Sequence, residues 1–437
     1  MNSANQFFVS FVPSWLIVLL RAFAPLRETL LCIVTLAVMA LPNANAENWD
    51  RFRGPNGAGQ SDDNSIPSSW EPANYLWKQP LTGIGHSSPV VWGDRLFLIS
   101  ADTPGTQIVS AYDARTGAVL WQKKLEAAAY HVHNLNSLAS STPAVDADRL
   151  YVLWLNNGQV NLVAFSHTGD ELWRREIGPY KEQHGFGISP IVIDDLVYVA
   201  RESGAASALT AYDCKTGDER WTIPHESNTT AFSTPCLLDP TAKQKLLLAT
   251  NTSTGLSALD ALTGKVVWQG LTEDLDQRCV SSPIIAGDMV LVGCGQGGKG
   301  KLLVAVRPGS DGSAPQEVYR LEQSMPQVPT PVVVGDLLFA VSDKGITSCY
   351  DVHTGKLHWR ERINGDYHSS PIRIGDRILA ISRQGEAVVL AADKEFKELG
   401  RNSLNELVVA TPAVANHRLY VRTDSSLMCI GNPAPTN

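Results

Sequence analysis

The stretch Ser87-Ser88-Pro89-Val90-Val91-Trp92-Gly93-Asp94-Arg95-Leu96-Phe97-Leu98-Ile99 contains two short apolar runs on either side of a Gly-Asp turn. Such a pattern predicts a tight antiparallel hairpin, because glycine supplies the positive φ that the turn requires. A third apolar run follows at residues 109–113, and a fourth follows the next turn, at residues 119–125. Residues 87–125 are therefore predicted to form one sheet of four short antiparallel strands.

The same unit recurs along the chain. Eight times a Ser or Thr directly precedes a proline, and a short apolar run and a turn follow. The prolines are about 40 to 54 residues apart, a spacing typical of repeat arrays; they are Pro89, Pro143, Pro190, Pro235, Pro283, Pro331, Pro371 and Pro412. Eight units of four strands predict an all-β fold, an eight-bladed β-propeller made of four-stranded antiparallel blades.

A second periodic feature is a tryptophan a few residues after a Thr-Gly turn. A tryptophan buries on the order of 150–250 Å², so these side chains are expected to be structural wedges between neighbouring blades. They are Trp121, Trp173, Trp221, Trp268 and Trp359, joined by Trp77 near the start of the array. Tyr319 stands at this position in the fifth unit and Leu399 in the seventh.

The eighth unit has only three strand-like runs before the chain ends. The missing run is found near the N-terminus, where residues 76–81 match residues 120–125 of the first unit. We therefore expect an N-terminal strand to complete the last blade and close the ring, which removes exposed sheet edges. The expected divisions of the mature chain are an extension at 47–75, the propeller at 76–431 and a tail at 432–437.

Residues 1–46 have the composition of a secretory signal peptide. Arg21 and Arg27 precede an apolar core at residues 29–41, and Ala44-Asn45-Ala46 has the form of a cleavage site. Cleavage after Ala46 would place the protein in the periplasm or outside the cell. The alternative is that the leader is retained as an anchor.

Charge and cysteine content narrow the function classes. The net charge is −8, and no basic block appears, which argues against nucleic acid and anionic membranes as partners. We expect a monomer.

The six cysteines after the leader contain no CxxC or adjacent pair, which gives no sign of a metal or c-type haem site. Cys279 and Cys294 flank one predicted hairpin and could form a disulfide; buried free thiols are the alternative.

The unit Ala111-Tyr112-Asp113-Ala114-Arg115-Thr116-Gly117-Ala118-Val119-Leu120-Trp121 resembles the repeat of the pyrroloquinoline-quinone (PQQ) propeller superfamily. Residues 211–221, 258–268 and 350–359 match it too, and residues 49–59 look like the start of secreted bacterial PQQ-like proteins. This resemblance implies an eight-bladed propeller. The superfamily contains dehydrogenases that bind PQQ and Ca²⁺, and also a non-enzymatic lipoprotein of the outer-membrane β-barrel assembly machine.

The chain departs from both kinds of relative. It lacks the adjacent Cys-Cys pair of many of the dehydrogenases, and their calcium-binding Glu, Asn and Asp have no counterparts that we can place in this sequence. It also lacks the small residue that a lipoprotein signal carries before its cysteine, because Cys32 follows Leu31. We therefore predict no catalytic residue and no cofactor; PQQ and Ca²⁺ stay open without support from site residues.

Candidate binding residues gather in the loops that precede the proline motifs, which converge on one face of a propeller. Their imidazole, guanidinium, amide and phenol groups would ring one mouth of the channel: His86, His131, His133, His184, Arg278, Gln327, Tyr367 and His368. Imidazole is the commonest metal ligand and titrates near neutral pH, so a metal, anion or small-ligand site is one interpretation. A solvated polar rim is the other, and the metal is unknown.

The sequence thus predicts an exported, non-catalytic propeller that acts as a binding or scaffold module, with envelope protein assembly as a candidate role. Its partners would be periplasmic or envelope proteins, or a small ligand at the channel mouth. The alternative is a PQQ-dependent dehydrogenase that oxidises an alcohol or a sugar.

Overall fold

The computed structural model describes residues 48–102, 105–181, 184–204, 206–227, 229–310 and 312–433. The leader predicted at residues 1–46 lies outside these ranges, as do the last four residues of the predicted tail. Within the described ranges, no helix is long and apolar enough to cross a membrane.

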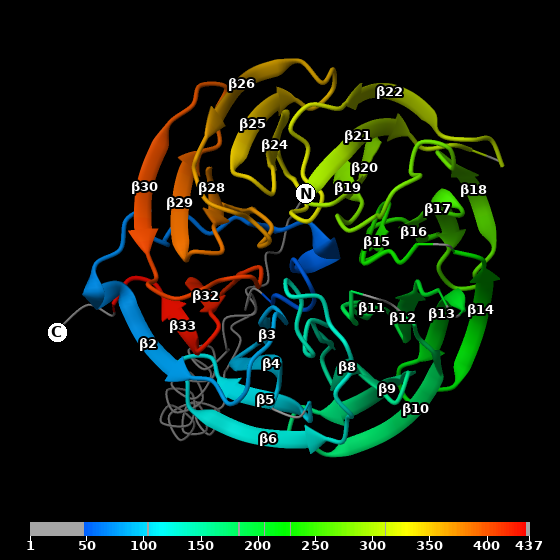
Figure 1. Cartoon of the computed structure of the whole chain (residues 1–437), viewed down its shortest axis with the longest axis horizontal. Helices are drawn as coiled ribbons and strands as arrows, with labels where there is room; N and C mark the ends of the chain where they lie inside the picture. Colours follow the sequence, from blue (N-terminus) through cyan, green and yellow to red (C-terminus); the bar gives the residue numbers. More distant parts are fainter. Residues whose placement is uncertain are drawn as a thin grey trace, which may run out of the picture. The chain divides into compact units, whose positions relative to one another are not determined.

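Eight antiparallel sheets of four strands surround a central axis (Figure 1), which confirms the predicted eight-bladed propeller. The first blade contains β3 (Val90–Trp92), β4 (Arg95–Ala101), β5 (Gln107–Asp113) and β6 (Val119–Leu125). The second contains β7 (Ala144–Val145), β8 (Arg149–Asn156), β9 (Gln159–Ser166) and β10 (Glu171–Pro179). The third contains β11 (Ile191–Ile193), β12 (Leu196–Arg201), β13 (Ser207–Asp213) and β14 (Glu219–His225). The fourth contains β15 (Cys236–Leu237), β16 (Leu246–Asn251), β17 (Gly255–Asp260) and β18 (Val266–Gly270).

The remaining blades follow in chain order. The fifth contains β19 (Ile284–Ala286), β20 (Met289–Gln296), β21 (Lys299–Arg307) and β22 (Gln316–Leu321). The sixth contains β23 (Val332–Val334), β24 (Leu337–Val341), β25 (Ile346–Asp351) and β26 (Leu357–Arg362). The seventh contains β27 (Ile372–Ile374), β28 (Arg377–Ile381), β29 (Glu386–Ala391) and β30 (Glu398–Ser403). The eighth contains β31 (Ala413–Ala415), β32 (Arg418–Arg422), β33 (Ser426–Ile430) and β2 (Tyr75–Pro80), and β2 pairs antiparallel with β33.

The position of a strand in its blade explains its composition. In the first blade, β4 and β5 are buried along nearly their whole length, because neighbouring blades cover both faces of the sheet. The outermost strand β6 is mostly exposed and carries Gln122, Lys123 and Lys124. The central strands therefore read as continuous apolar runs, whereas the outer strands mix apolar and polar residues.

The periodic tryptophans link each blade to the next. The indole of Trp77 lies against Gly117, so close that a Cβ on this glycine would come 2.6 Å from the ring, and φ at Gly117 is 74°. The indole N–H donates to the carbonyl of Ala114 at 3.2 Å. Trp121, Trp173, Trp221 and Trp359 each donate to a carbonyl of the next blade in the same way. In the first four blades the Thr-Gly turn is thus the docking point for the preceding blade's tryptophan. The seventh blade has no such turn, and Trp359 donates to the carbonyl of Asp393 there.

Trp268 is the wedge that lacks this hydrogen bond among the described residues. The fifth blade has no Thr-Gly turn, since residues 308–315 replace it. Trp268 is still buried, but its indole nitrogen has no hydrogen-bond partner among the described residues. Its packing role survives without the hydrogen bond.

The Ser or Thr before each proline forms a belt around the channel. The backbone N–H of one blade's residue donates to the hydroxyl oxygen of the next blade's residue, at 3.0 Å in each case. Within the described residues, seven such bonds join the Ser/Thr belt, which consists of Ser88, Thr142, Ser189, Thr234, Ser282, Thr330, Ser370 and Thr411. The eighth blade closes onto the first, because the N–H of Thr411 donates to Ser88.

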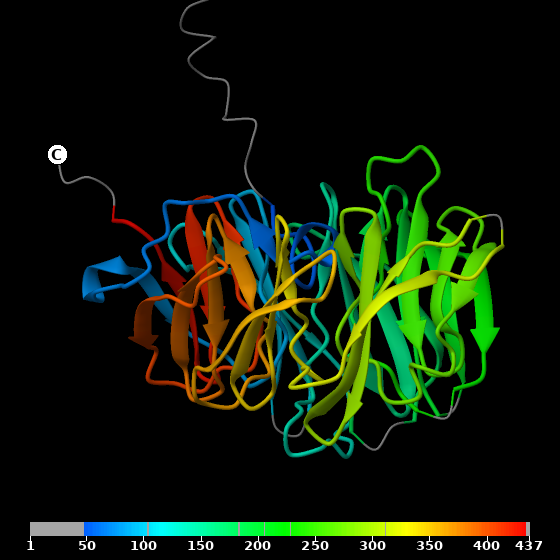
Figure 2. The same cartoon turned by 90° about the horizontal axis from the view of Figure 1, so that it is seen from above.

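The N-terminal segment, residues 49–61, enters the channel and closes one end of it (Figures 1 and 2). We call this segment the plug. Trp49 bridges to Val91 of the first blade, and β1 (Gln60–Ser61) pairs in parallel with β27 of the seventh. The short 3-10 helix η1 (Pro55–Gly57) lies between them, and Asn56 exchanges two hydrogen bonds with Leu237 of the fourth.

Arg53 is the centre of the plug. It is fully buried, and no carboxylate of the described residues pairs with it. Its guanidinium instead donates to five backbone carbonyls, those of Gly57, Ala58, Thr330, Pro331 and Pro371. Burial lowers its pKa to about 9. Three of these carbonyls belong to the sixth and seventh blades, so one side chain joins the N-terminus to positions about 280 to 320 residues away along the chain.

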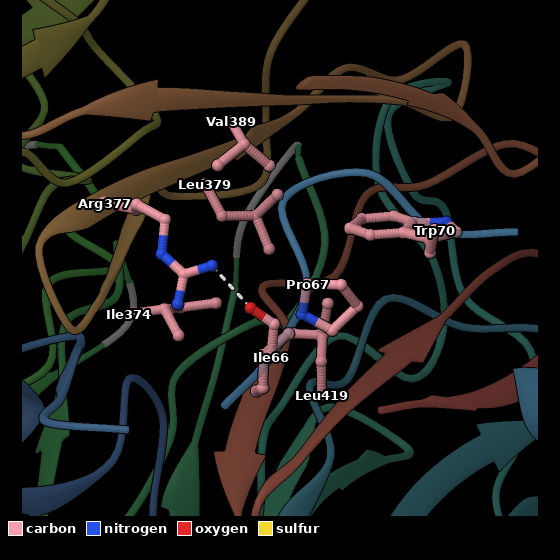
Figure 3. Close-up of a pocket in the computed structure, with 8 residues that line it drawn as sticks. All are labelled: Ile66, Pro67, Trp70, Ile374, Arg377, Leu379, Val389 and Leu419. Carbon is pink, nitrogen blue, oxygen red and sulfur yellow. Dashed lines mark hydrogen bonds between the residues drawn. The ribbon is translucent and has the colours of Figure 1, made fainter. Parts of the chain in front are cut away.

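Beyond the plug, residues 62–74 cross the seventh and eighth blades to reach β2, and include the short 3-10 helix η2 (Pro72–Asn74). Ile66 and Trp70 are buried against Leu379, Val389 and Leu419, and Arg377 donates to the carbonyl of Ile66 (Figure 3). The cavity left there is only about 10 Å³, so this strap fills the groove between the two blades.

Replacing Trp77 with alanine should lower the free energy of unfolding by about 3 kcal/mol, as for other large aromatic truncations. The loss removes the contact with Gly117 and the hydrogen bond to Ala114, both between the last and first blades. Urea unfolding of the mature protein measures the change. Leu120→Ala, at an exposed position next to a wedge, is the control; equal stabilities of the two variants would contradict the wedge role.

Replacing Arg53 with methionine should destabilise the protein by at least about 3 kcal/mol, because buried carbonyls in two blades lose their donor. Arg307→Met is the matched control, since Arg307 is exposed and pairs only with Asp288. Thermal melting of both variants is the measurement. A melting temperature of Arg53→Met equal to that of the control would contradict the role of the plug.

Candidate functional site at the open end of the channel

The channel holds a cavity of about 790 Å³ at the end opposite the plug. Each innermost strand starts at the cavity and ends at the plug, so the loops that precede these strands form the cavity's mouth. Phe52 of the plug and seven members of the Ser/Thr belt line it, all except Ser282. The cavity is thus a one-ended funnel, and the sequence did not show that the other end is closed.

The structure brings together six of the eight residues proposed from the sequence as a binding rim. The cavity is lined by His86, His133, His184, Arg278, Gln327 and His368. The other two lie elsewhere: His131 is exposed and outside the cavity, and Tyr367 is fully buried in the core between the sixth and seventh blades. Whether the lining residues bind a ligand stays a prediction.

Four charged lining residues were not proposed from the sequence. Asp343 and Lys344 lie in the turn between β24 and β25, Asp366 precedes β27, and Arg383 lies in the turn between β28 and β29. The two turns share a signal, because Ser342 and Ser382 each stand three residues before a glycine with positive φ. In a propeller these turns reach the same face as the loops before the innermost strands.

Most charged groups in the cavity already have partners. Lys344 Nζ lies 2.8 Å from Asp366 Oδ1. The Asp343 carboxylate accepts the backbone N–H groups of Gln327 at 2.7 Å and Val328 at 3.2 Å; its burial nevertheless raises its pKa.

A pair of imidazoles in contact, tilted relative to one another, also lines the cavity. The rings of His133 and His184 have centroids 5.3 Å apart, and Arg278 Nη1 lies 2.8 Å from His184 Nδ1. Asn136 donates to the carbonyl of His184 at 2.7 Å, which ties the long loop before β7 to the loop before β11.

Two further imidazoles are held neutral. Burial, followed by the neighbouring Arg422, His368 and Arg383, lowers the pKa of His86 to about 3. Burial also lowers the pKa of His368 to about 4, with Arg383 as the next cause. At neutral pH each ring therefore offers one N–H donor and one acceptor nitrogen, with no charge.

A further histidine near one of these loops, His225, does not line the cavity. It lies at the end of β14, 2.7 Å from Glu202 Oε1, and both side chains are nearly buried. Burial opposes ionisation of His225, but the hydrogen bond to the Glu202 carboxylate, the charge of that carboxylate and the carbonyl of Ile223 together raise the pKa of the imidazole.

The donor set does not fit the calcium ion that the superfamily resemblance implies. Ca²⁺ takes six to eight oxygen ligands. In the part of the chain that the structure describes, no group of three or more His, Cys, Asp or Glu side chains is arranged to hold a metal ion. The two cavity carboxylates, Asp343 and Asp366, are directed at backbone N–H groups and at Lys344. The cavity carboxylates are therefore not arranged to hold the Ca²⁺ that would accompany PQQ.

The cysteines are likewise buried free thiols and not disulfides, including Cys279 and Cys294, which share one core cluster. Burial raises the pKa of both thiols, so neither is a nucleophile at neutral pH.

Comparison with known proteins agrees with the repeat pattern. A family model described as outer membrane protein assembly factor BamB matches residues 68–160, 105–312 and 156–398, which together span most of the chain. The chain belongs to this family. The BamB protein of Burkholderia pseudomallei is 24% identical over 357 residues, covering 77% of this chain and 81% of that protein.

Dehydrogenases of the same superfamily are similar as well. Subunit 1 of methanol dehydrogenase [cytochrome c] from Paracoccus denitrificans is 31% identical over 160 residues, 32% of this chain. The match spans about a quarter of that relative's length. A solved europium-containing methanol dehydrogenase superposes with a TM-score of 0.68 at 13% identity, covering 88% of this chain and 91% of that one; this shows the shared fold.

The neutral imidazoles predict a pH dependence of stability. The folded-state pKa values of His86 and His368 lie below the ordinary value of 6.5, so the unfolded chain binds more protons between about pH 6.5 and 4. The free energy of unfolding should therefore fall as the pH drops through this window. The double variant His86→Gln, His368→Gln should lose part of this slope in urea unfolding from pH 7 to 4. His353→Gln replaces an exposed histidine and is the control, so its slope should equal that of the wild type. An equal slope in the double variant would contradict the role of His86 and His368 in the pH dependence.

Proposed function

We propose that this chain is an exported, non-catalytic propeller that binds partner proteins in the assembly of envelope proteins. The observation that carries the proposal is the BamB family match across residues 68–398, together with a BamB relative aligned over 77% of the chain. The predicted leader at residues 1–46 supports a location in the envelope.

The geometry supports a binding role. The Ser/Thr belt and the plug tie the blades into one ring, so the loops at the open end have fixed positions relative to one another. Leu135 at the mouth is 40% exposed, next to polar and charged side chains. Rigid scaffolds that present loops of mixed character on one face are suited to recognition of a partner.

A photo-crosslinking residue at position 135 tests this proposal in cells of the source organism. The matched control is position 262, since Leu262 is 72% exposed and lies in the β17–β18 turn, which reaches the plug face of the ring. We expect position 135, and not position 262, to crosslink to proteins of outer-membrane β-barrel assembly. Crosslinks to such proteins at neither position, or equally at both, would contradict recognition through the open face.

The second candidate is a PQQ-dependent dehydrogenase, which the 31% identity to a methanol dehydrogenase subunit favours over part of the chain. Calorimetric titration of the mature protein with PQQ, with and without Ca²⁺, distinguishes the two functions. One-to-one binding that requires Ca²⁺ and supports dye-coupled oxidation of methanol or glucose would replace the first proposal. If PQQ binds neither with Ca²⁺ nor without it, the PQQ-like repeat is a feature of the fold alone.

A further inference from the structure

Three basic side chains line the cavity from the seventh and the first blade. Arg383 lies in the β28–β29 turn of the seventh blade, His368 in the loop that leads into that blade, and His86 in the loop that leads into the first. The backbone N–H of Arg383 donates to the carbonyl of Asp366 at 2.7 Å, two residues before His368, so the Arg383 turn adjoins the His368 loop. Arg383 and His368 also oppose ionisation of His86, and Arg383 opposes that of His368.

Arg383 differs from the other cations of the cavity in having no partner. Lys344 is paired with Asp366, and Arg278 contacts His184. Among the described residues, no carboxylate lies within ion-pair distance of the Arg383 guanidinium, and its Nε is buried without an acceptor. An arginine carries five N–H donors, and Arg383 is half-buried, so the buried N–H without an acceptor is the one at Nε.

The fully buried arginines of this protein show how the chain satisfies such a group where no ligand is needed. Arg53 donates to five backbone carbonyls, and Arg422 donates to the carbonyls of Ser87 and Ile99 and to the hydroxyl of Ser100. Arg383 has no such set of oxygen atoms, although it lies on the same ring. Its donors face a cavity that is open to solutes.

The neighbouring imidazoles complement this charge. No hydrogen bond joins the ring nitrogens of His86 or His368 to other groups in the described ranges, and a neutral ring has one N–H to donate. Beneath them, the belt residues Ser88, Ser370 and Thr411 line the floor. A fixed positive charge with nearby N–H and O–H donors is the arrangement that binds an oxyanion.

The rest of the cavity indicates the size and character of the ligand. Its volume, about 790 Å³, is far larger than an inorganic anion needs and is in the range of small-molecule sites. Phe52, Phe232, Val280, Val328 and Val409 supply apolar walls. A ligand that uses the whole cavity would have an anionic group at one end and an apolar body.

We propose that Arg383, His86 and His368 form an oxyanion subsite for a small organic anion. Arg383 binds the carboxylate or phosphate group, and the two neutral imidazoles donate to its remaining oxygens. The apolar part of the ligand lies against the plug residue Phe52 and the wall residue Phe232. This site is independent of the partner-protein role, because it lies inside the channel.

Calorimetric titration of the mature protein tests the subsite with three anionic probes and one neutral probe. Phenyl phosphate and phenylacetate distinguish a phosphate site from a carboxylate site, inorganic phosphate lacks the apolar body, and benzyl alcohol lacks the charge. We expect one aryl anion to bind saturably and more tightly than inorganic phosphate or benzyl alcohol. Arg383→Gln should weaken it at least about tenfold, the loss of about 1.4 kcal/mol of interaction.

Controls keep the test decisive. Arg307→Gln removes an exposed arginine that pairs with Asp288 and should leave the affinity unchanged. Arg383→Lys keeps the charge and should retain part of the affinity. If Arg383→Gln melts at a lower temperature than the wild type, Arg383→Lys takes its place as the test variant. Absence of saturable binding of both aryl anions at millimolar concentration would overturn the proposal. Equal affinities of wild type and the Arg383 variants would also overturn it.

Discussion

The hydrogen bonds of the Ser/Thr belt are the interaction on which the rest of the ring depends. Seven of the eight belt residues, within the part of the chain that the structure describes, donate a backbone N–H to the hydroxyl of the next, as from Ser88 to Thr142, and Thr411 returns to Ser88. The proline that follows each of these residues holds the preceding backbone extended. The same residue type at the same place in every blade therefore sets a common distance from the axis, and the loops and the cavity are built on this ring.

Closure of the ring requires contacts between residues that are far apart in the sequence. β2 supplies the outer strand of the eighth blade, Trp77 packs against the first, and Arg53 bonds to the sixth and seventh. Arg53 and Arg422 are buried without carboxylates, and carbonyl oxygens satisfy them. The N-terminal segment is thus both the closing strand of the propeller and the floor of its channel.

These features leave a scaffold with one open face. The belt hydroxyls and the plug form the bottom of the funnel, and the loops before the innermost strands form its walls. The charges within it are mostly satisfied by each other or by the backbone, as in the pair of Lys344 and Asp366. The cavity is thus held in a fixed shape by contacts within the ring.

The sequence by itself determined the repeat, the strand pattern, the wedges and most of the rim, because these depend on contacts within a blade or between consecutive blades. Each Asp-x-x-Thr-Gly turn is built locally: the carboxylate of Asp113 accepts N–H groups from Arg115 and Thr116. Such motifs recur and can be read from the sequence.

Only the tertiary structure decided which rim residues face the cavity and what closes the channel. Tyr367 and His368 are neighbours in an extended segment, so one points into the core and the other into the cavity. The plug could not be read from residues 49–61, because the acceptors of Arg53 in the sixth and seventh blades lie about 280 to 320 residues away. Arg383 stands in a turn with no special pattern of its own. Whether a carboxylate lies near its guanidinium depends on side chains that other blades place around the cavity. The local sequence carries no information about the distances between those side chains.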